Sequence, residues 1–218
     1  MLLWVNYIKK HQYCKTFKKD AKFEFRPGLN ILVGDQGSGK STLLKDIFET
    51  VMGTMGKPKD DGVHRYDYKT IEESGLDFRT SASKGWSIIL HDSEKNNPRI
   101  KSYFDKDIAF QISSMYVSHG ESHRAIMRGL GAKEDLTKTI IMIDEPDVAM
   151  SPMSIVELYG ILKRVSKENQ VIIAAHNPLL MLLHDEVLDI VTGKFVSPQD
   201  YLNALLKKKK IKIQLARV

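Results

Sequence analysis

The glycine-rich segment VGDQGSGKSTLL, residues 33–44, has residue types and spacing that suit a bound phosphate. It follows the pattern G-x-x-x-x-G-K-[ST] from Gly34 to Ser41. In this pattern the glycines let successive backbone N–H groups point at phosphate oxygens, and the following helix adds the positive end of its dipole. We expect Lys40 to reach the β- and γ-phosphates and the Ser41 hydroxyl to bind Mg²⁺. The alternative is a glycine-rich turn that precedes a helix by chance. The predicted nucleotide-binding residues of this segment are Gly34, Asp35, Gln36, Gly37, Ser38, Gly39, Lys40, Ser41 and Thr42.

Two carboxylates end the apolar segment IIMIDEP, residues 140–146. If this segment is a buried strand beside the strand that leads into the glycine-rich loop, Asp144 can hold Mg²⁺ through water, and Glu145 can orient and polarise an attacking water. Ser41 and Asp144 are therefore the predicted metal-binding residues, and Glu145 and Lys40 are predicted catalytic residues. The alternative is an ordinary strand end that meets solvent.

A histidine ends another apolar segment, IIAAHNP. Ligands of open α/β sheets bind at the carboxyl ends of the strands, so a neutral imidazole at this place can hydrogen-bond the γ-phosphate or the attacking water. We predict His176 as a third catalytic residue; the alternative is a polar strand end without a role.

The segment SHGESHRAIMRGL offers a hydroxyl and backbone N–H groups at the start of a predicted helical run. Ser118, Gly120 and Glu121 are therefore further predicted nucleotide-binding residues, because such a helix start can meet an anion. His119 and His123 are four residues apart, but the pattern lacks the glutamate of H-E-x-x-H and a third ligand, which disfavours zinc.

The elements that must position these residues alternate between strands and helices. Apolar runs predict strands in GWSIIL, TKTIIMIDEP and QVIIAAHNP, of the kind that is buried on both faces of a parallel sheet. Helical spacing predicts helices in STLLKDIFETVMG, which Gly53 closes, in the segment that Ser151 and Pro152 start, and in PQDYLNALLKKKK. This alternation predicts an α/β fold with a mostly parallel sheet flanked by helices.

Two hairpins are predicted in addition. KFEFRPGLNILVG alternates apolar and polar residues and turns at Pro27-Gly28, so it predicts a hairpin that delivers the strand Leu29 to Val33 into the glycine-rich loop. EVLDIVTGKFVS predicts a second hairpin with its turn at Thr192-Gly193. Residues 53–84 read as a loop-rich insertion with one or two short strands.

Length and composition favour one α/β domain over residues 1–218, with an insert or helical subdomain at about 53–130. No apolar run approaches the roughly 18 residues of a membrane span, and the first residues lack the features of a signal peptide. The single cysteine, Cys14, excludes an internal disulfide and indicates a cytoplasmic setting. Net charge is +6, part of it in a basic tail at 207–218 that suits phosphate backbones or an acidic partner; a tail that only aids solubility is the alternative.

These motifs, in this order, resemble those of ABC-type ATPases from residue 23 to about 180, and the soluble SMC/RecF/OLD-like branch in particular, including small "predicted ATPase" proteins with SHGES and DEP…SP. The family signature is close to L-S-G-G-Q, and residues 117–121 occupy its place with Ser118 and Gly120 retained and His119 in place of the first glycine. The resemblance implies a P-loop NTPase fold with an N-terminal antiparallel β portion and a small helical subdomain that carries the signature.

The resemblance also implies a mechanism. Two subunits form an ATP-dependent homodimer, head to tail around two ATP molecules, with Ser118 and Gly120 of one subunit on the γ-phosphate held by the other. Glu145 is the base, Asp144 and Ser41 bind magnesium, and His176 senses the γ-phosphate. Asp147 falls where the family's dimer-contacting loop lies.

Two further family features have several candidates in this sequence. The loop that couples ligand state to the helical subdomain has the candidates Gln111, Glu94 and Asn96. The adenine-stacking side chain has the candidates Phe17, Phe23 and Phe25, although strand aromatics are usually part of the core.

We therefore predict an ATP-hydrolysing switch that acts on DNA or with a nuclease-type partner in repair, replication or defence. The alternative is the nucleotide-binding subunit of a membrane ABC transporter, which the degenerate signature and the DVAMSP loop disfavour. A kinase or GTPase is a third class, and the DEP strand, the following AAH strand and the lack of an N-K-x-D motif argue against it.

Overall fold

The computed structural model describes residues 1–56, 66–81, 86–92 and 137–208. Within them it contains a six-stranded sheet of order β5-β6-β7-β3-β8-β9 and a three-stranded sheet of order β2-β1-β4. The strands of the larger sheet are β3 (Leu29–Val33), β5 (Ser87–Asp92), β6 (Thr139–Asp144), β7 (Gln170–Ala174), β8 (Val187–Asp189) and β9 (Lys194–Val196). Those of the smaller sheet are β1 (Leu2–Tyr7), β2 (Lys22–Glu24) and β4 (Leu76–Thr80).

The larger sheet is parallel except at one edge. Strands β5, β6, β7, β3 and β8 pair in parallel, and β9 pairs antiparallel to β8. The β8–β9 pair confirms the predicted second hairpin, and Gly193 in its turn has the positive φ of 70° that glycine adopts without strain. The smaller sheet is antiparallel throughout.

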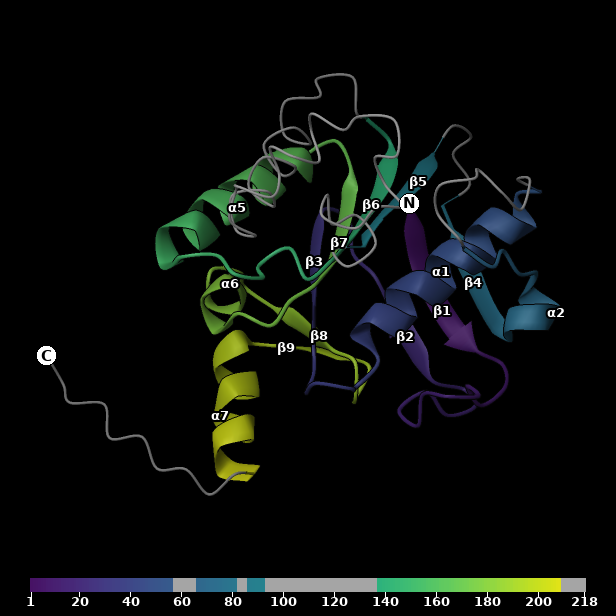
Figure 1. Cartoon of the computed structure of the whole chain (residues 1–218), viewed down its shortest axis with the longest axis horizontal. Coiled ribbons are helices and arrows are strands. Elements are labelled where there is room, and N and C mark those ends of the chain that lie inside the picture. The colour runs from purple at the N-terminus through teal and green to yellow at the C-terminus, as the bar shows by residue number, and fades with distance from the viewer. Residues whose placement is uncertain (57–65, 82–85, 93–136, 209–218) are drawn as a thin grey trace, which may run out of the picture.

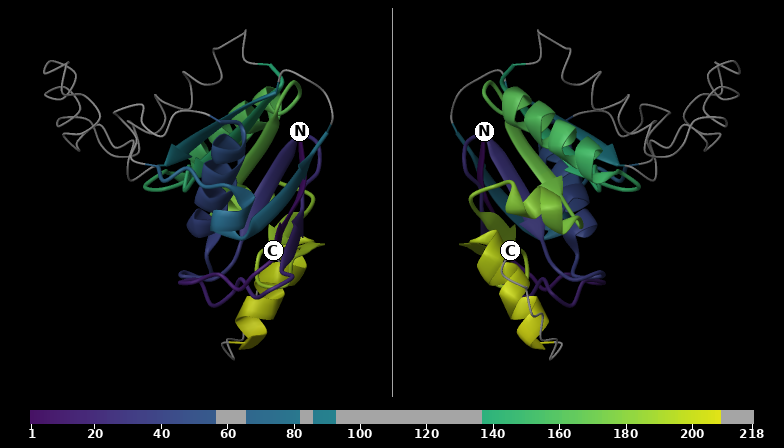
Figure 2. Two further views of the ribbon diagram at one scale, coloured as in Figure 1. Left: turned by 90° about the vertical axis from the view of Figure 1, so that its right-hand side faces the viewer. Right: turned by 90° about the vertical axis from the view of Figure 1, so that its left-hand side faces the viewer.

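Helices cover both faces of the parallel sheet, as Figure 1 shows. Helix α1 (Lys40–Thr54) shares a core with the three-stranded sheet on one face, and α5 (Pro152–Val165) and α6 (Pro178–Leu182) cover the other. Helix α7 (Pro198–Lys208) packs on α6, and both views in Figure 2 show it projecting from one end of the molecule. The short helix α2 (Ile71–Ser74) packs on α1. The predicted α/β fold is confirmed.

The apolar residues of the central strands alternate between the two cores. In β6, Ile140 and Met142 face α1, whereas Ile141 and Ile143 face α5. The middle strands are buried on both faces because helices cover the sheet on each side, which explains their nearly continuous apolar runs. At the start of β7 the fully buried Gln170 joins the sheets: its Oε1 accepts from the Leu2 N–H at 2.7 Å, and its Nε2 donates to the Leu2 carbonyl at 2.8 Å.

The hairpin predicted for KFEFRPGLNILVG, residues 22–34, is wrong. Strand β2 pairs with β1, and β3 lies in the other sheet between β7 and β8. The turn at Gly28, whose φ is 82°, therefore carries the chain from one sheet to the other. Phe23 and Phe25 on one side of this turn are buried in the core that the two sheets share, and that burial outweighs a local strand pairing.

Two further expectations are corrected. Gly53 does not close the helix but lies within α1, where a Cβ would meet the Lys69 carbonyl oxygen at 2.3 Å. A glycine fits at this position because the backbone of Lys69 approaches α1 too closely for a side chain. Strand β6 does not lie directly beside the strand that leads into the glycine-rich loop, because β7 separates β6 from β3.

Candidate functional site

The glycine-rich loop connects the end of β3 to the start of α1, in the middle of the parallel sheet. Gly37 and Gly39 have φ angles of 75° and 102°, in the left-handed region that favours glycine. Gly34 is required for space, since a Cβ there would lie 2.5 Å from the Ser38 hydroxyl. The cap position of α1 is Gly39, which has no side chain to cap the helix. The first N–H groups of α1 therefore face the loop without a side-chain partner at the cap, as an anion site needs.

Lys40, the first residue of α1, is buried with 4% of its surface exposed. Its ammonium donates to the carbonyls of Gly34, at 2.8 Å, and Asp35, at 3.3 Å. Burial lowers the pKa of Lys40 from its usual value, and the nearby carboxylates Glu145 and Asp144 oppose that shift. The loop thus holds a buried cation close to two acids.

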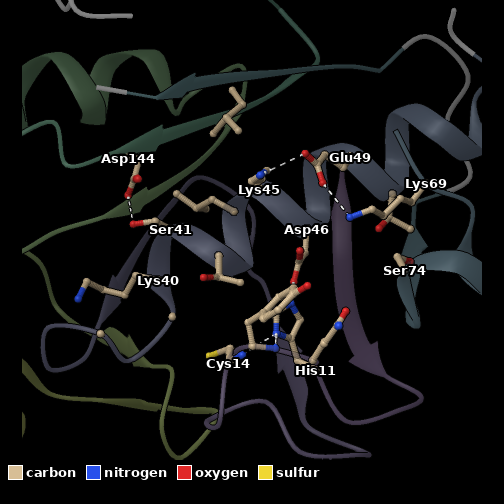
Figure 3. Close-up of a pocket in the computed structure, with 18 of the residues that line it drawn as sticks. His11, Cys14, Lys40, Ser41, Lys45, Asp46, Glu49, Lys69, Ser74 and Asp144 are labelled. Atoms are coloured by element: carbon tan, nitrogen blue, oxygen red, sulfur yellow. Dashed lines mark hydrogen bonds and ion pairs between the residues drawn. The ribbon is translucent and has the colours of Figure 1, made fainter. Parts of the chain in front are cut away.

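Ser41 and Asp144 meet across the sheet, as the dashed line in Figure 3 shows. The Ser41 hydroxyl donates to Oδ1 of Asp144 at 3.0 Å, although 103 positions separate them. The start of α1 reaches over the end of β7 to make this contact with the end of β6. A hydroxyl and a carboxylate at this separation are the oxygen ligands that suit Mg²⁺, which is commonly held by one or two protein oxygens together with phosphates.

Glu145 and His176 form a second pair next to the first. Nε2 of His176 lies 3.1 Å from Oε1 of Glu145, and both side chains are partly exposed. Glu145 has a φ of 49°, a conformation that side-chain-bearing residues rarely adopt. Its backbone N–H donates to the Ala174 carbonyl at 3.0 Å, which joins the ends of β6 and β7. Strain of this kind persists where the surroundings enforce it, and it gathers at functional sites.

The side chain of Asp147 points into its own chain. It is 5% exposed, and its Oδ2 accepts hydrogen bonds from the backbone N–H groups of His176, at 2.9 Å, and Asn177. The dimer contact implied for this loop stays a prediction.

Lys40, the Ser41–Asp144 pair and the Glu145–His176 pair line a cavity of about 760 Å³, within the range of roughly 300–1,000 Å³ that is typical of small-molecule sites. Figure 3 shows the cavity extending from Ser41 and Asp144 along one side of α1. Its wall includes parts of the glycine-rich loop, the strand ends, α1 and the loop that follows β1. Among the residues on this wall are Tyr13, Cys14, Gln36, Gly37, Gly39, Lys40, Ser41, Thr42, Asp144, Glu145 and His176. Asp35 is exposed and pairs with Lys208 at the end of α7, at 3.4 Å.

The three phenylalanines considered for adenine stacking are all buried in the core. Phe17 stacks on Tyr7 with ring centroids 4.8 Å apart, so its face is not free for a ligand. The aromatic side chain that does line the cavity is Tyr13, which is 83% exposed. It sits in the polar segment KKHQYCK, and no apolar pattern in the sequence singles it out.

His11 holds the loop that carries Tyr13. Its Nδ1 accepts from the backbone N–H groups of Tyr13, at 3.2 Å, and Cys14, at 2.8 Å. Its Nε2 lies 3.2 Å from Oδ2 of Asp46 on α1, and the Tyr7 hydroxyl donates to the same oxygen at 2.6 Å. Burial raises the pKa of Asp46, and these two partners oppose the shift. The loop is thereby tied to the helix that begins at Lys40.

Several predicted residues lie outside the described part of the chain, in residues 93–136. They are Ser118, Gly120 and Glu121 of the signature segment, His119 and His123, and the loop candidates Glu94, Asn96 and Gln111. The predicted insert or helical subdomain at about 53–130 is described only in part, through residues 53–56, 66–81 and 86–92, and most of the basic tail is outside the described residues. Among the described residues, no group of three or more His, Cys, Asp or Glu side chains could hold a metal ion. In the same residues no helix has both the length and the apolar character needed to cross a membrane.

The fold and the cavity define an ATP-binding domain of the ABC-type P-loop ATPases. A family model described as an AAA domain matches residues 8–217, nearly the whole chain, and the chain belongs to this family.

Three relatives of the chain are ATP-binding proteins. The chain is 25% identical over 215 residues to ATP-binding cassette sub-family B member 6 of Xenopus tropicalis, covering 88% of this chain and 25% of that protein. It is 24% identical over 203 residues to the galactose/methyl galactoside import ATP-binding protein MglA of Fusobacterium nucleatum. This match covers 83% of this chain and 40% of that protein. The chain therefore spans less than half the length of these relatives. It is 25% identical over 227 residues to the energy-coupling factor transporter ATP-binding protein EcfA1 of Caldanaerobacter subterraneus. This match covers 92% of this chain and 80% of that protein.

A solved structure of an ABC transporter in an inward-facing conformation shares the fold. It aligns with a TM-score of 0.50 at 13% identity, over 94% of this chain and 88% of that one.

Proposed function

We propose that this domain binds ATP with Mg²⁺ and hydrolyses it in the cavity at the carboxyl ends of β3, β6 and β7. The observation that carries the proposal is the meeting of Lys40, the Ser41–Asp144 pair and the Glu145–His176 pair on one cavity. Family membership and the ATP-binding relatives support the choice of ATP.

The glycine-rich loop binds the phosphates. Backbone N–H groups from Gly34 to Thr42, together with the start of α1, surround the phosphate oxygens, and Lys40 turns from its loop carbonyls to the β- and γ-phosphates. When bound, Mg²⁺ neutralises charge on these phosphates. Ser41 and Asp144 are the residues that hold it, Asp144 directly or through a water.

Glu145 acts as the general base for the attacking water. Its carboxylate lies at the cavity wall and touches His176, which can hydrogen-bond the γ-phosphate or the water in turn. Positioning of the water and the phosphate supplies most of the catalysis of phosphoryl transfer, so the fixed geometry of this pair matters more than any covalent step.

The exposed ring of Tyr13 supplies a surface for the adenine. Its position on the wall of the same cavity, on a loop tied to α1 through His11 and Asp46, supports this role. An aromatic ring and a base bind face to face with little dependence on base identity.

The second half of the site comes from another subunit. Ser118, Gly120 and Glu121 would contact the nucleotide held by the loop of the partner, which makes the working unit an ATP-dependent homodimer. The support is the resemblance in the order of motifs, because these three residues lie outside the described structure. Size-exclusion chromatography of Glu145→Gln with Mg-ATP tests the dimer, and a monomeric profile at saturating ATP would contradict it.

The partner of this ATPase is a membrane transporter or DNA with its processing enzymes. Two of the relatives, an import ATP-binding protein and a transporter ATP-binding protein, favour the first, and the relatives give the predicted DNA-related role no support. The SMC/RecF/OLD-like branch and the cytoplasmic location likewise stay proposals.

Lys40→Ala tests the binding site. Loss of the buried ammonium removes the cation on the β- and γ-phosphates, so we expect ATP affinity to fall by at least about tenfold, equivalent to roughly 1.4 kcal/mol. Equilibrium binding of a fluorescent ATP analogue measures this, with Lys163→Ala as the control because Lys163 lies in the last turn of α5, away from the cavity. Equal affinities of Lys40→Ala and the wild type would exclude this loop as the phosphate site.

A further inference from the structure

The turn after β6 and the loop after β7 are joined by one buried carboxylate. Oδ2 of Asp147 accepts from the consecutive backbone N–H groups of His176 and Asn177. Hydrogen bonds to an ionised acceptor are shorter and stronger than neutral ones. The other carboxylate oxygen, Oδ1, is buried and has no hydrogen-bond partner in the described structure, so the contacts of this side chain concentrate on the backbone at His176.

The loop that carries His176 is fixed on either side of this contact. Before it, the Ala175 N–H donates to the Leu32 carbonyl at 3.1 Å. After it, the Asn177 side chain accepts from the Leu179 N–H at 2.9 Å and caps α6. Within the described residues, Asp147 is the acceptor for the backbone N–H of His176 itself.

The turn that carries Asp147 is itself strained. Glu145 and Ala149, on either side of it, have φ angles of 49° and 57°. Left-handed conformations at residues with side chains persist when surrounding contacts enforce them. The Asp147 carboxylate is such a contact, since it fastens the middle of this turn to the neighbouring loop.

Removing Asp147 would release the backbone of His176 and with it the imidazole that faces Glu145. Oδ2 of Asp147 accepts from the N–H of His176 itself, so this contact fixes the point from which the imidazole extends. The pair is 3.1 Å apart, and displacements of about 1 Å can slow an enzymatic reaction by about 100-fold.

We infer that Asp147 is a positioning residue for ATP hydrolysis, which sets the imidazole of His176 against the carboxylate of Glu145. This inference rests on the proposed function, because it assigns His176 and Glu145 to the reaction. Asp147 is buried and does not line the cavity, and it acts through the backbone of the His176 loop.

The test compares Asp147→Ala, Asp147→Asn and His176→Ala in steady-state ATP hydrolysis, with ATP affinity measured separately. Asp147→Ala loses the acceptor, so we expect kcat to fall by about 10- to 100-fold while the Kd for ATP stays within about threefold. Asp147→Asn keeps an oxygen that can accept both N–H groups, so its kcat should stay within about threefold of wild type. If Asp147→Asn is as slow as Asp147→Ala, the negative charge matters instead and the inference is overturned.

The double variant Asp147→Ala/His176→Ala separates positioning from stability. Because Asp147 acts through His176, the double variant should be no slower than His176→Ala alone. A further loss of the full Asp147→Ala factor would overturn the inference. If His176→Ala itself hydrolyses ATP at the wild-type rate, then the role of His176 in the proposed function is wrong, and the inference falls with it.

Asn169→Ala is the matched control for a lost buried acceptor. Asn169 is also 5% exposed and accepts a backbone N–H, that of Thr139 at 3.0 Å, at the opposite ends of β6 and β7. We expect it to lower the melting temperature as Asp147→Ala does, without the loss of kcat. A matching loss of kcat in Asn169→Ala would show that general destabilisation explains the effect.

Discussion

His11 and Tyr13 show how much of a site can depend on a few polar contacts. The imidazole of His11 accepts two backbone N–H groups and faces the carboxylate of Asp46, and this fixes the turn from which Tyr13 enters the cavity. Burial and the nearby Asp46 raise the pKa of the Tyr7 hydroxyl, which therefore stays a proton donor to that carboxylate. An exposed tyrosine thereby acquires a defined place on the wall of the proposed nucleotide site.

We predict that Tyr13→Ala lowers the affinity for ATP and that Tyr13→Phe does not. Stacking of a base on an aromatic ring contributes roughly 1–3 kcal/mol, so the alanine variant should lose about five- to 100-fold in affinity. Phenylalanine keeps the ring, and the exposed hydroxyl is dispensable for stacking. Isothermal titration calorimetry measures both. Wild-type affinity in Tyr13→Ala would remove Tyr13 from the site.

At the scale of elements, the site depends on close contacts between α1 and its surroundings. The loop before α1 packs on Cys14, since a Cβ at Gly39 would lie 2.6 Å from its sulfur. Farther along, α1 approaches the backbone of Lys69 at Gly53. The helix is thus held at both ends by positions that exclude a side chain.

Gly53→Ala and Gly160→Ala form a matched pair of helix substitutions with opposite expected effects. Alanine in a helix normally gains up to about 1 kcal/mol over glycine. Gly160 in α5 has open space around its Cβ position, so its substitution should raise the free energy of unfolding by about that amount. At Gly53 the clash with the Lys69 backbone should instead lower it by about 1–3 kcal/mol. Chemical denaturation measures both, and stabilisation by Gly53→Ala would show that the helices pack differently.

The sequence predicts the elements whose signals are local. The glycine-rich loop, the carboxylates after β6, His176 after β7 and the turn at Gly193 all follow from short patterns with a direct physical meaning. The meeting of the loop, the carboxylates and His176 in one cavity follows from the rule that parallel strands end at the same edge.

The rest depends on contacts between distant segments. Strand β2 pairs with β1 because Phe23 and Phe25 pack into the core between the sheets, which a pattern of alternating residues cannot distinguish from a hairpin with β3. Strand β1 itself was not predicted as a strand. Likewise the roles of Asp147 and His11 come from hydrogen bonds to backbone groups, which carry no mark in the sequence.

At the scale of the whole molecule, the described residues form the proposed nucleotide site, and the chain is similar to ATP-binding proteins of ABC transporters. Hydrolysis rates with and without double-stranded DNA, and sedimentation of the tagged protein with membranes, separate the two partner classes. The relatives lead us to expect co-sedimentation with membranes and no stimulation by DNA. Stimulation by DNA without membrane association would reverse this assignment.

The central claim is that Glu145 activates water in a site that binds ATP through the glycine-rich loop. Phosphate release from Mg-ATP by the wild type and by Glu145→Gln, at matched saturation, tests it most directly. A general base contributes about 10²- to 10⁴-fold, so we predict release at least about 100-fold slower in Glu145→Gln, with the Kd for ATP within about threefold of wild type. Equal rates of phosphate release in the two proteins would contradict the account.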